Sequence, residues 1–277
     1  MRKLTFALLT TIAIAFAFLI MRGEERVTSS TVQTKILFHP SISELKVIQE
    51  SRIESDLQLE LHNTSEREIT AFVITAYDRL TKQEGTTHRM DYAFSDNEAE
   101  DSIVPGQKVV FQGSFSSDLK DNEFVLRAVV FTDGTFKGDP QAVQQIFDYR
   151  RGQRAPFLAY TKELESAITR LDKQVASRVR SPRPAVDFFH ATMKPELNRV
   201  RAAIRINSKL LGDNSKNESN IYKSALQFGE THLLKELEEL DAAEATNDLP
   251  ALWGKVKYSE ERWRKFCARM QAGGDRQ

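Results

Sequence analysis

The sequence has little cysteine, little histidine and no net charge, and each shortage narrows the functions that it can support. Its 277 residues include one cysteine, Cys267, which excludes an internal disulfide and a thiolate-rich metal site. Lysine plus arginine equals aspartate plus glutamate at 39 each, so the chain lacks the cationic surplus of a dedicated nucleic-acid-binding protein. With 40% hydrophobic and 28% charged residues, it has the composition of a globular protein with room for two modest domains.

Motifs of catalysis and cofactor binding are also missing. The sequence contains no G-x-S-x-G, no glycine-rich phosphate loop, no H-E-x-x-H and no C-x-x-C. The one carboxylate cluster with metal-binding character, Asp96–Asp101, lacks the glycine and distal glutamate of a calcium loop, so a solvated loop is favoured. No two of the histidines share ligand spacing: His39, His62, His88, His190 and His232. We therefore predict no catalytic, cofactor-binding or metal-binding residues, and a protein that is not an enzyme.

Residues 1–23 are typical of a targeting segment. Arg2 and Lys3 precede an uncharged run over residues 4–21, which as a helix would span roughly 27 Å, close to the thickness of a bilayer core. One interpretation is a signal peptide cleaved near Ala17, since Ala-Phe-Ala fits the small-x-small rule. The other is a retained single-pass anchor with the body outside the cytoplasm, and the apolar residues that continue to Met21 favour it. A buried core helix is the third and weakest alternative.

Residues 24–33 read as a polar tether, and residues 34–139 alternate apolar and polar side chains as half-buried strands do. Leu57, Leu59 and Leu61 are one such series. Pro105-Gly106 predicts a type II turn, and Asp133-Gly134 predicts a two-residue hairpin. At least six short strands without a helical pattern between them indicate an antiparallel β-sandwich.

Two of these strands are apolar on both faces. In residues 69–78 we expect Ile69, Ala71 and Val73 on one face, and Phe72 and Ile74 on the other. In the second strand the expected faces are as follows: Phe124, Leu126, Ala128 and Val130 on one, and Val125, Val129 and Phe131 on the other. A free sandwich would keep its outer face polar. We therefore expect the helical part to cover this face and form one rigid body with it; the alternative is an exposed docking face.

From Pro140 to residue 271 the apolar period becomes helical, with Asp139 as the expected N-cap. The first helix is predicted to break near Gly152. A seam follows at Phe157, Leu164, Ile168, Leu171, Val175 and Val179. Three further helices are expected over residues 186–211, with a kink or restart at Pro195, over 220–246, and after Asp248. Residues 272–277 are a frayed tail, so the chain is predicted to be an α+β protein with a C-terminal helical bundle.

Charge is distributed in blocks despite the neutral total. Residues 43–101 carry a net charge of −8, residues 148–211 carry +8 and residues 212–248 carry −6. The favoured interpretation is that the basic helices lie beside the acidic helix and the acidic sandwich. The alternative is an external anionic partner, such as a phospholipid surface, that faces six arginines: Arg178, Arg180, Arg183, Arg199, Arg201 and Arg205.

The aromatic residues of the last helix, Trp253, Trp263 and Phe266, have helical spacing, so a core stripe is favoured over a sugar platform. Cys267 is expected to be a buried apolar residue. Glycosylation sequons at Asn63 and Asn217 are expected by chance.

Three stretches within residues 57–139 carry a family resemblance: the hairpin N-T-S…I-T-A-F at 63–72, the Pro105-Gly106 turn and V-F-T-D-G-T at 130–135. They resemble bacterial envelope proteins in which a signal segment precedes an immunoglobulin-like sandwich. The resemblance implies fold and location and carries no catalytic residues.

Together these features predict a non-enzymatic, membrane-anchored or exported envelope protein that binds another protein. Residues 4–21 would hold it in the membrane. The alternative is an exported enzyme or ligand-binding protein with a site between sandwich and helices, for which Asp78, His88 and Asp91 are candidate groups.

Overall fold

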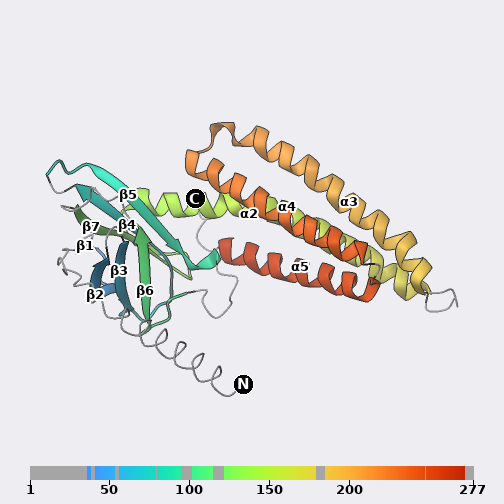
Figure 1. The fold of residues 1–277 in the computed structure, drawn as a ribbon, viewed down its shortest axis with the longest axis horizontal. Coiled ribbons are helices and arrows are strands. Elements are labelled where there is room, and N and C mark those ends of the chain that lie inside the picture. The colour runs from blue at the N-terminus through green and yellow to red at the C-terminus, as the bar shows by residue number, and fades with distance from the viewer. Residues whose placement is uncertain are drawn as a thin grey trace, which may run out of the picture.

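The structure is a computed structural model that describes residues 36–38, 41–53, 56–78, 80–94, 102–114, 122–178, 185–246 and 248–271. The described chain is a mixed α+β protein, with two β-sheets at one end and four α-helices at the other (Figure 1). The predicted targeting segment, tether, acidic cluster and tail lie outside these residues. Within them, no helix combines the length and apolar character needed to cross a bilayer.

The two sheets are antiparallel apart from one short parallel pair. The first sheet consists of β2 (Leu45–Ile53), β3 (Asp56–Asn63) and β6 (Lys108–Ser114), in that order. The second sheet has the order β5 (Glu84–Asp91), β4 (Ile69–Asp78) and β7 (Asn122–Phe131). Two short strands also pair with β7: β1 (Ile36–Phe38) in parallel and β8 (Phe136–Gly138) antiparallel. The chain crosses between the sheets after β1, β3, β5 and β6, and one buried cluster contains residues of both sheets, so the two sheets pack face to face as a sandwich.

The core between the sheets contains Phe72 and Ile74, which the alternation pattern had assigned to the outer face. That assignment was wrong because two β-bulges change the phase of the alternation. The register with β7 shifts between Ile69 and Ala71, which leaves Thr70 as an extra residue on β4. A second shift leaves Arg127 as an extra residue on β7. Beyond each bulge the inward and outward positions are exchanged.

Helix α2 (Pro140–Arg178) covers the outer face of the second sheet, as expected from its apolar character. One buried cluster joins the two parts, with four small side chains from the sheet and four from the first two turns of the helix: Ala71, Val73, Ala128, Val130, Ala142, Val143, Ile146 and Phe147. All eight are at most 8% exposed. The sandwich and the helices therefore share a core, and the alternative of an exposed docking face on this sheet is wrong.

The turn residues behave largely as predicted. Gln107 N donates to Val104 O (3.0 Å) and Gly106 has φ of 78°, which together define the type II turn. The hairpin at Asp133-Gly134 also forms, but its loop has four residues, because β7 ends at Phe131 and β8 begins at Phe136.

Asn63, the residue of the first sequon, is completely buried at the end of β3. Its Nδ2 donates to Arg67 O and Ile103 O (2.7 Å each), and its Oδ1 accepts from Ser65 N (3.0 Å). The side-chain amide that a glycan would modify is thus buried and hydrogen-bonded within the folded chain.

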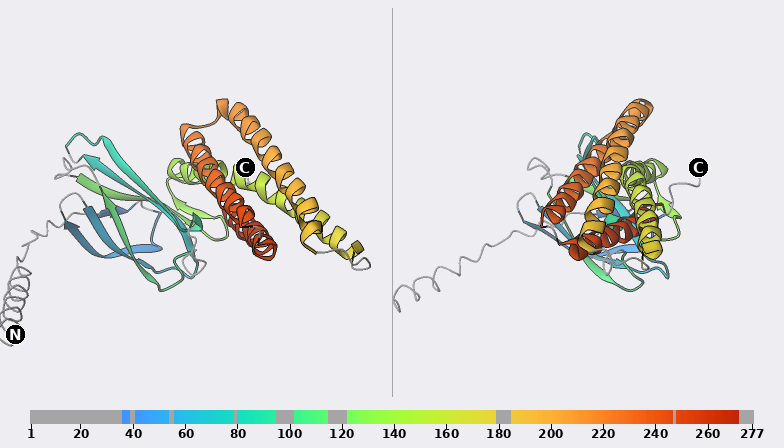
Figure 2. Two further views of the ribbon diagram at one scale, coloured as in Figure 1. Left: turned by 45° about the vertical axis from the view of Figure 1, so that its right-hand side comes forward. Right: turned by 90° about the vertical axis from the view of Figure 1, so that its right-hand side faces the viewer.

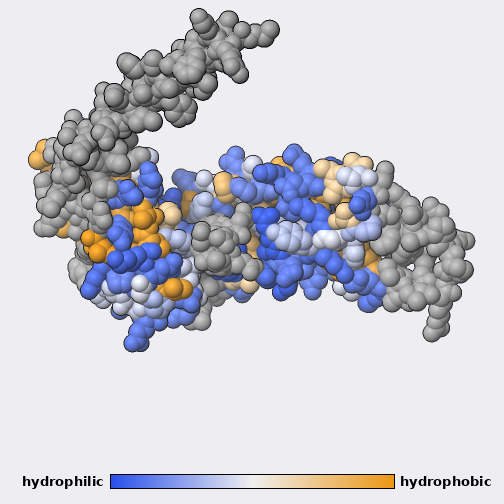
Figure 3. All heavy atoms as spheres, turned by 60° about the horizontal axis from the view of Figure 1, so that its bottom comes forward, coloured by the Kyte–Doolittle hydropathy of each residue, from blue (hydrophilic) through white to orange (hydrophobic). Residues whose placement is uncertain are grey.

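Three helices pack beside α2: α3 (Ala185–Asn214), α4 (Asn220–Ala245) and α5 (Leu249–Gln271). Short 3-10 turns lie at Tyr92–Phe94 (η2) and Ser215–Asn217 (η4). Figure 2 shows the sandwich at one end of an elongated body and the helices at the other, and on the face drawn in Figure 3 the described surface of the helical end is mostly hydrophilic. The bundle core includes Phe157, Leu164 and Leu171 of the predicted seam.

The predicted break near Gly152 is wrong, because α2 continues through Gly152 and Pro156 for 39 residues. Gly152 lies directly against the backbone of α4. A Cβ at this position would lie 2.5 Å from Tyr222 O and 2.9 Å from Ala225 Cβ. The glycine is a contact point between helices, and the packing of α4 outweighs its low helix propensity. In the same way, α3 runs without a break through Pro195.

The charge blocks are partly complementary within the chain, as the favoured interpretation required. Arg201 on α3 pairs with Asp241 and Glu244 on α4. Arg199 pairs with Glu196 on its own helix. Of the other arginines in the proposed anion-binding set, Arg205 is exposed, and the side chain of Arg178 and residues 180 and 183 lie outside the described part. These pairs reduce the charge that α3 can offer to an external anion.

Cys267 is buried, as predicted, and burial raises the pKa of its thiol from 9.0 to about 12. A rise of this size lowers the thiolate fraction at pH 8 by roughly a thousandfold. We expect a disulfide-exchange reagent to label the folded protein at least about a hundredfold more slowly than the protein unfolded in guanidinium. The release of the coloured thiol product measures both rates. Equal rates would show that the thiol is accessible in the native state.

Candidate functional site

A cleft of about 610 Å³ lies between the sandwich and the helices. The sandwich side consists of Thr87–Asp91, five consecutive residues of β5. The helix side comes from three helices, and it includes residues of α2 (Ile146, Tyr149, Gln153, Phe157), α4 (Phe228, His232, Lys235, Glu236, Glu239) and α5 (Arg262, Trp263, Phe266). The cleft adjoins the buried cluster on β4 and β7 and opens beside the strand at the edge of the same sheet.

The helix side of the cleft rests on stacked aromatic rings. The rings of Phe157 and Trp263 are parallel within 13° with centroids 3.7 Å apart, and Phe266 packs edge-on against both. Phe228 is 48% exposed and its ring centroid lies 4.2 Å from that of His232. Trp263 and Phe266 belong to the bundle core, as predicted, and the same two side chains border the cleft.

A buried ion pair connects β5 to α2 at one end of the cleft. Arg150 donates from Nε to Asp91 Oδ2 and from Nη2 to Asp91 Oδ1, both at 2.8 Å. Its Nη2 also donates to Thr70 Oγ1 (3.0 Å) on the bulge of β4. The two charged side chains are only 1% and 6% exposed. This bidentate geometry satisfies the Asp91 carboxylate and gives it a structural role.

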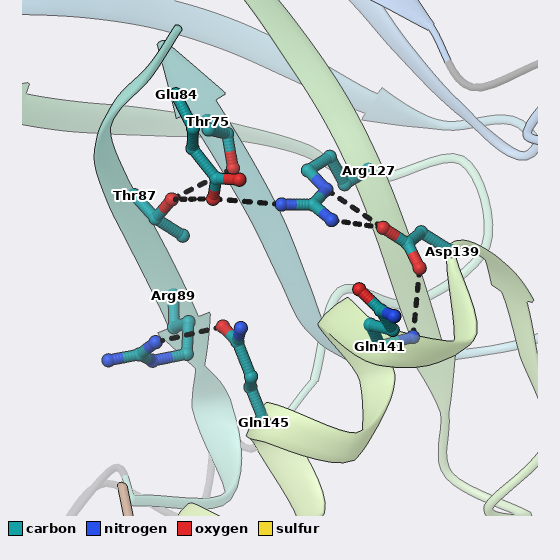
Figure 4. Close-up of polar contacts among 8 residues, drawn as sticks. All are labelled: Thr75, Glu84, Thr87, Arg89, Arg127, Asp139, Gln141 and Gln145. Carbon is teal, nitrogen blue, oxygen red and sulfur yellow. Dashed lines mark hydrogen bonds and ion pairs between the residues drawn. The ribbon is translucent and has the colours of Figure 1, made fainter. Parts of the chain in front are cut away.

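A second polar group lies where the sheet meets the start of α2 (Figure 4). Arg127, the bulge residue of β7, donates to Asp139 Oδ2 (3.0 Å from Nε) and to Glu84 Oε1 (2.9 Å). Asp139 also accepts from Gln141 N (2.8 Å), so it caps α2 as predicted. Because one carboxylate binds both the strand and the helix, it sets where α2 leaves the sheet.

The pKa of Asp139 gives a testable pH dependence. Burial alone would raise the pKa, but the hydrogen bonds from Arg127 and the helix N–H groups outweigh it and hold the pKa below its usual 3.8. A lowered native pKa contributes stability that is complete above the unfolded value and is lost as the pH falls through the native value. We expect Asp139→Asn, which keeps the cap but removes the charge, to be less stable than wild type at pH 7. The difference in unfolding free energy between wild type and Asp139→Asn, measured with urea, should narrow below about pH 4. A difference that does not depend on pH would contradict a stabilising role of the Asp139 charge.

The structure brings two of the three candidate groups of the enzyme hypothesis to the cleft. His88 donates from Nε2 to Ser114 O (2.9 Å), and Asp91 binds Arg150. Asp78 lies outside the cleft, where it accepts hydrogen bonds from Leu80 N (2.9 Å) and Thr81 N (2.6 Å); the bond from Thr81 lowers its pKa. Sequence reasoning missed the side chains of α4, although Phe228, His232, Lys235 and Glu239 recur at helical spacing.

The other two carboxylates of the cleft are also engaged within the chain. Glu236 is 3% exposed and accepts from Ser259 Oγ, whose oxygen in turn bonds the hydroxyl of Tyr160 (3.0 Å). Burial raises the pKa of Tyr160, so the hydroxyl stays protonated. Glu239 accepts from Lys255 Nζ (2.6 Å), a bond that lowers the pKa of this carboxyl group.

Two cations of the cleft form no ion pair among the described residues. Arg89 on β5 donates from Nη1 to the amide oxygen of Gln145 (3.1 Å), apart from the Arg127 group (Figure 4). Lys235 on α4 is exposed and makes no ion pair within the described part of the chain. The charged side chains of the cleft that remain outside an ion pair are therefore cations, one on the sandwich side and one on the helix side.

Within the described residues, no three His, Cys, Asp or Glu side chains are grouped to hold a metal ion. No protein-family model matches the chain, and no curated protein matches it either.

Proposed function

We propose that this chain is a non-enzymatic, membrane-anchored or exported envelope protein that binds another protein at the cleft between its sandwich and its helices. One observation carries the proposal: every carboxylate of the cleft is engaged within the chain, while Arg89 and Lys235 are left for a partner. Carboxylates held by partners of their own, beside cations without an ion pair, suit the recognition of an anionic group.

The sandwich in this proposal is immunoglobulin-like. Two features support this finer description: β2 to β8 pair as two sheets, β2-β3-β6 and β5-β4-β7-β8, and between β2 and β8 the chain crosses from one sheet to the other three times. The resemblance of residues 57–139 to envelope proteins points the same way. Residues 4–21 would act as the membrane anchor, with cleavage near Ala17 as the alternative.

The location and the binding function are tested in one strain that carries a C-terminal tag. External protease should remove the tag from intact spheroplasts. Capture of the tagged full-length protein from the membrane fraction should enrich a partner, and Arg89→Glu with Lys235→Glu should reduce that enrichment. A tag that protease reaches only after lysis would exclude a body outside the cytoplasm.

The second candidate is an exported ligand-binding protein. The cleft volume of about 610 Å³ lies within the range of small-molecule sites, which favours this candidate. Native mass spectrometry of the protein purified from its own membrane fraction would test it. A bound mass that is lost in the same double variant would favour a small ligand over a protein partner.

A further inference from the structure

The sandwich side of the cleft is the edge of a β-sheet. Among the strands that the structure describes, β5 pairs only with β4, so its other edge carries backbone N–H and C=O groups without a neighbouring strand. Five consecutive residues of β5 border the cleft. Side chains of consecutive strand residues point to opposite faces of a sheet. What all five residues can present to the cleft is therefore their main chain, along the edge of the strand.

From this edge and its surroundings we infer that the cleft takes an extended acidic segment of a partner protein, which adds to β5 as a further strand. The inference rests on the proposed function and specifies the chemistry of the partner. A strand added to a free edge gains main-chain hydrogen bonds regardless of sequence, and its specificity comes from pockets for alternate side chains. Five residues of edge span roughly 17 Å, which suits a segment of about five residues.

The charge of the cleft selects an acidic segment. Arg89 lies on the edge strand and Lys235 lies across the cleft on α4, and neither forms an ion pair in the described chain. The acidic side chains nearby are held by Arg150, Ser259 and Lys255. An incoming carboxylate would thus meet cations whose charge is not already neutralised by an ion pair.

The aromatic residues add a preference for one apolar side chain. Phe228 is half exposed beside His232, and the side chain of Tyr149 is partly exposed on the same side of the cleft. Successive side chains of a bound strand alternate, so one set would face the helices and the other would face away. The expected ligand pattern is therefore an acidic residue and a large apolar residue two positions apart.

The test uses the full-length chain in detergent and a phage-displayed library of random dodecapeptides as the probe. Enriched peptides should be acidic with the alternating pattern, and a synthetic copy should bind Arg89→Glu/Lys235→Glu at least tenfold more weakly. The matched control, Arg205→Glu/Lys209→Glu, makes the same charge change on exposed positions of α3 and should alter affinity less than twofold. Unchanged far-ultraviolet dichroism establishes that both variants fold.

Hydrogen exchange distinguishes an added strand from other occupants. Peptide binding should slow amide exchange within residues 87–91 at least tenfold and leave β2 unchanged. Peptides without acidic bias, affinity unaffected by the cleft variant, or exchange unchanged in β5 would each overturn the inference. Dimerisation through β5 that excludes the peptide would overturn it in favour of a second copy. The proposed function is tested separately: it fails if the body lies in the cytoplasm, if no partner is captured from the membrane fraction, or if the cleft variant captures that partner as well as wild type does.

Discussion

Replacing Arg150 by leucine is expected to destabilise the protein by about 3–5 kcal/mol, the largest effect that we predict for a single side chain. The substitution leaves the Asp91 carboxylate at the junction of sandwich and helices, 6% exposed and without its bidentate partner. A buried charge without compensation costs far more than the net contribution of the pair that it came from. Urea unfolding at pH 7, followed by circular dichroism, measures the loss.

A double replacement separates the ion pair from simple packing. Arg150→Leu with Asp91→Leu removes both charges, so it should cost less than Arg150→Leu alone. The control is Arg264→Leu, because Arg264 forms an exposed i, i+4 pair with Glu260 and should change stability by less than about 0.5 kcal/mol. A double variant as unstable as the sum of its single variants would mean that the two charges do not interact.

Replacing Gly152 by alanine is expected to destabilise the protein by about 1–3 kcal/mol, although alanine is the better helix former by about 1 kcal/mol. The added methyl group would lie 2.5 Å from the backbone oxygen of Tyr222, a distance that side-chain rotation cannot relieve. Helices α2 and α4 must therefore move apart, which disturbs their close packing at this point.

Gly254 provides the matched control for this substitution. It lies inside α5, and a Cβ there would have no heavy atom within 4 Å. Gly254→Ala should therefore stabilise the protein by about 0.5–1 kcal/mol through helix propensity alone. Opposite signs for the two substitutions in thermal or urea unfolding support the close approach of α4; stabilisation by both would exclude it.

Much of the fold could be predicted from local patterns. Alternation located β3, β4, β6 and β7, but not β5. The Asp139-Pro140 pair located the start of α2, and the apolar outer face of β4 and β7 required a cover that α2 supplies. The exchange of faces could not be predicted, since Thr70 and Arg127 become bulge residues only through their pairing with the opposite strand. The predicted break at Gly152 was wrong because the contact that requires a glycine there comes from another helix, α4.

The cleft was less accessible to sequence reasoning than the fold. Asp91 and His88 could be named as candidates because the sequence pattern places them near a strand end, but the partner of Asp91 is 59 residues away. The side chains of α4 have a clear helical period, yet only the packing of α2, α4 and α5 shows that this stripe faces β5. Whether a cation is neutralised depends on such distant neighbours, so Arg89 and Lys235 could not be distinguished from other surface charges.

The length of α2 has a mechanical consequence. Its first two turns belong to the core shared with the sheet, and residues from Phe157 onward belong to the core of the bundle, so one rod of roughly 58 Å serves both. No hinge separates the two parts at residue 139. A fragment that ends at residue 139 would expose the alanine and valine side chains of the sheet to water and would tend to self-associate. The intact chain should unfold as one cooperative unit.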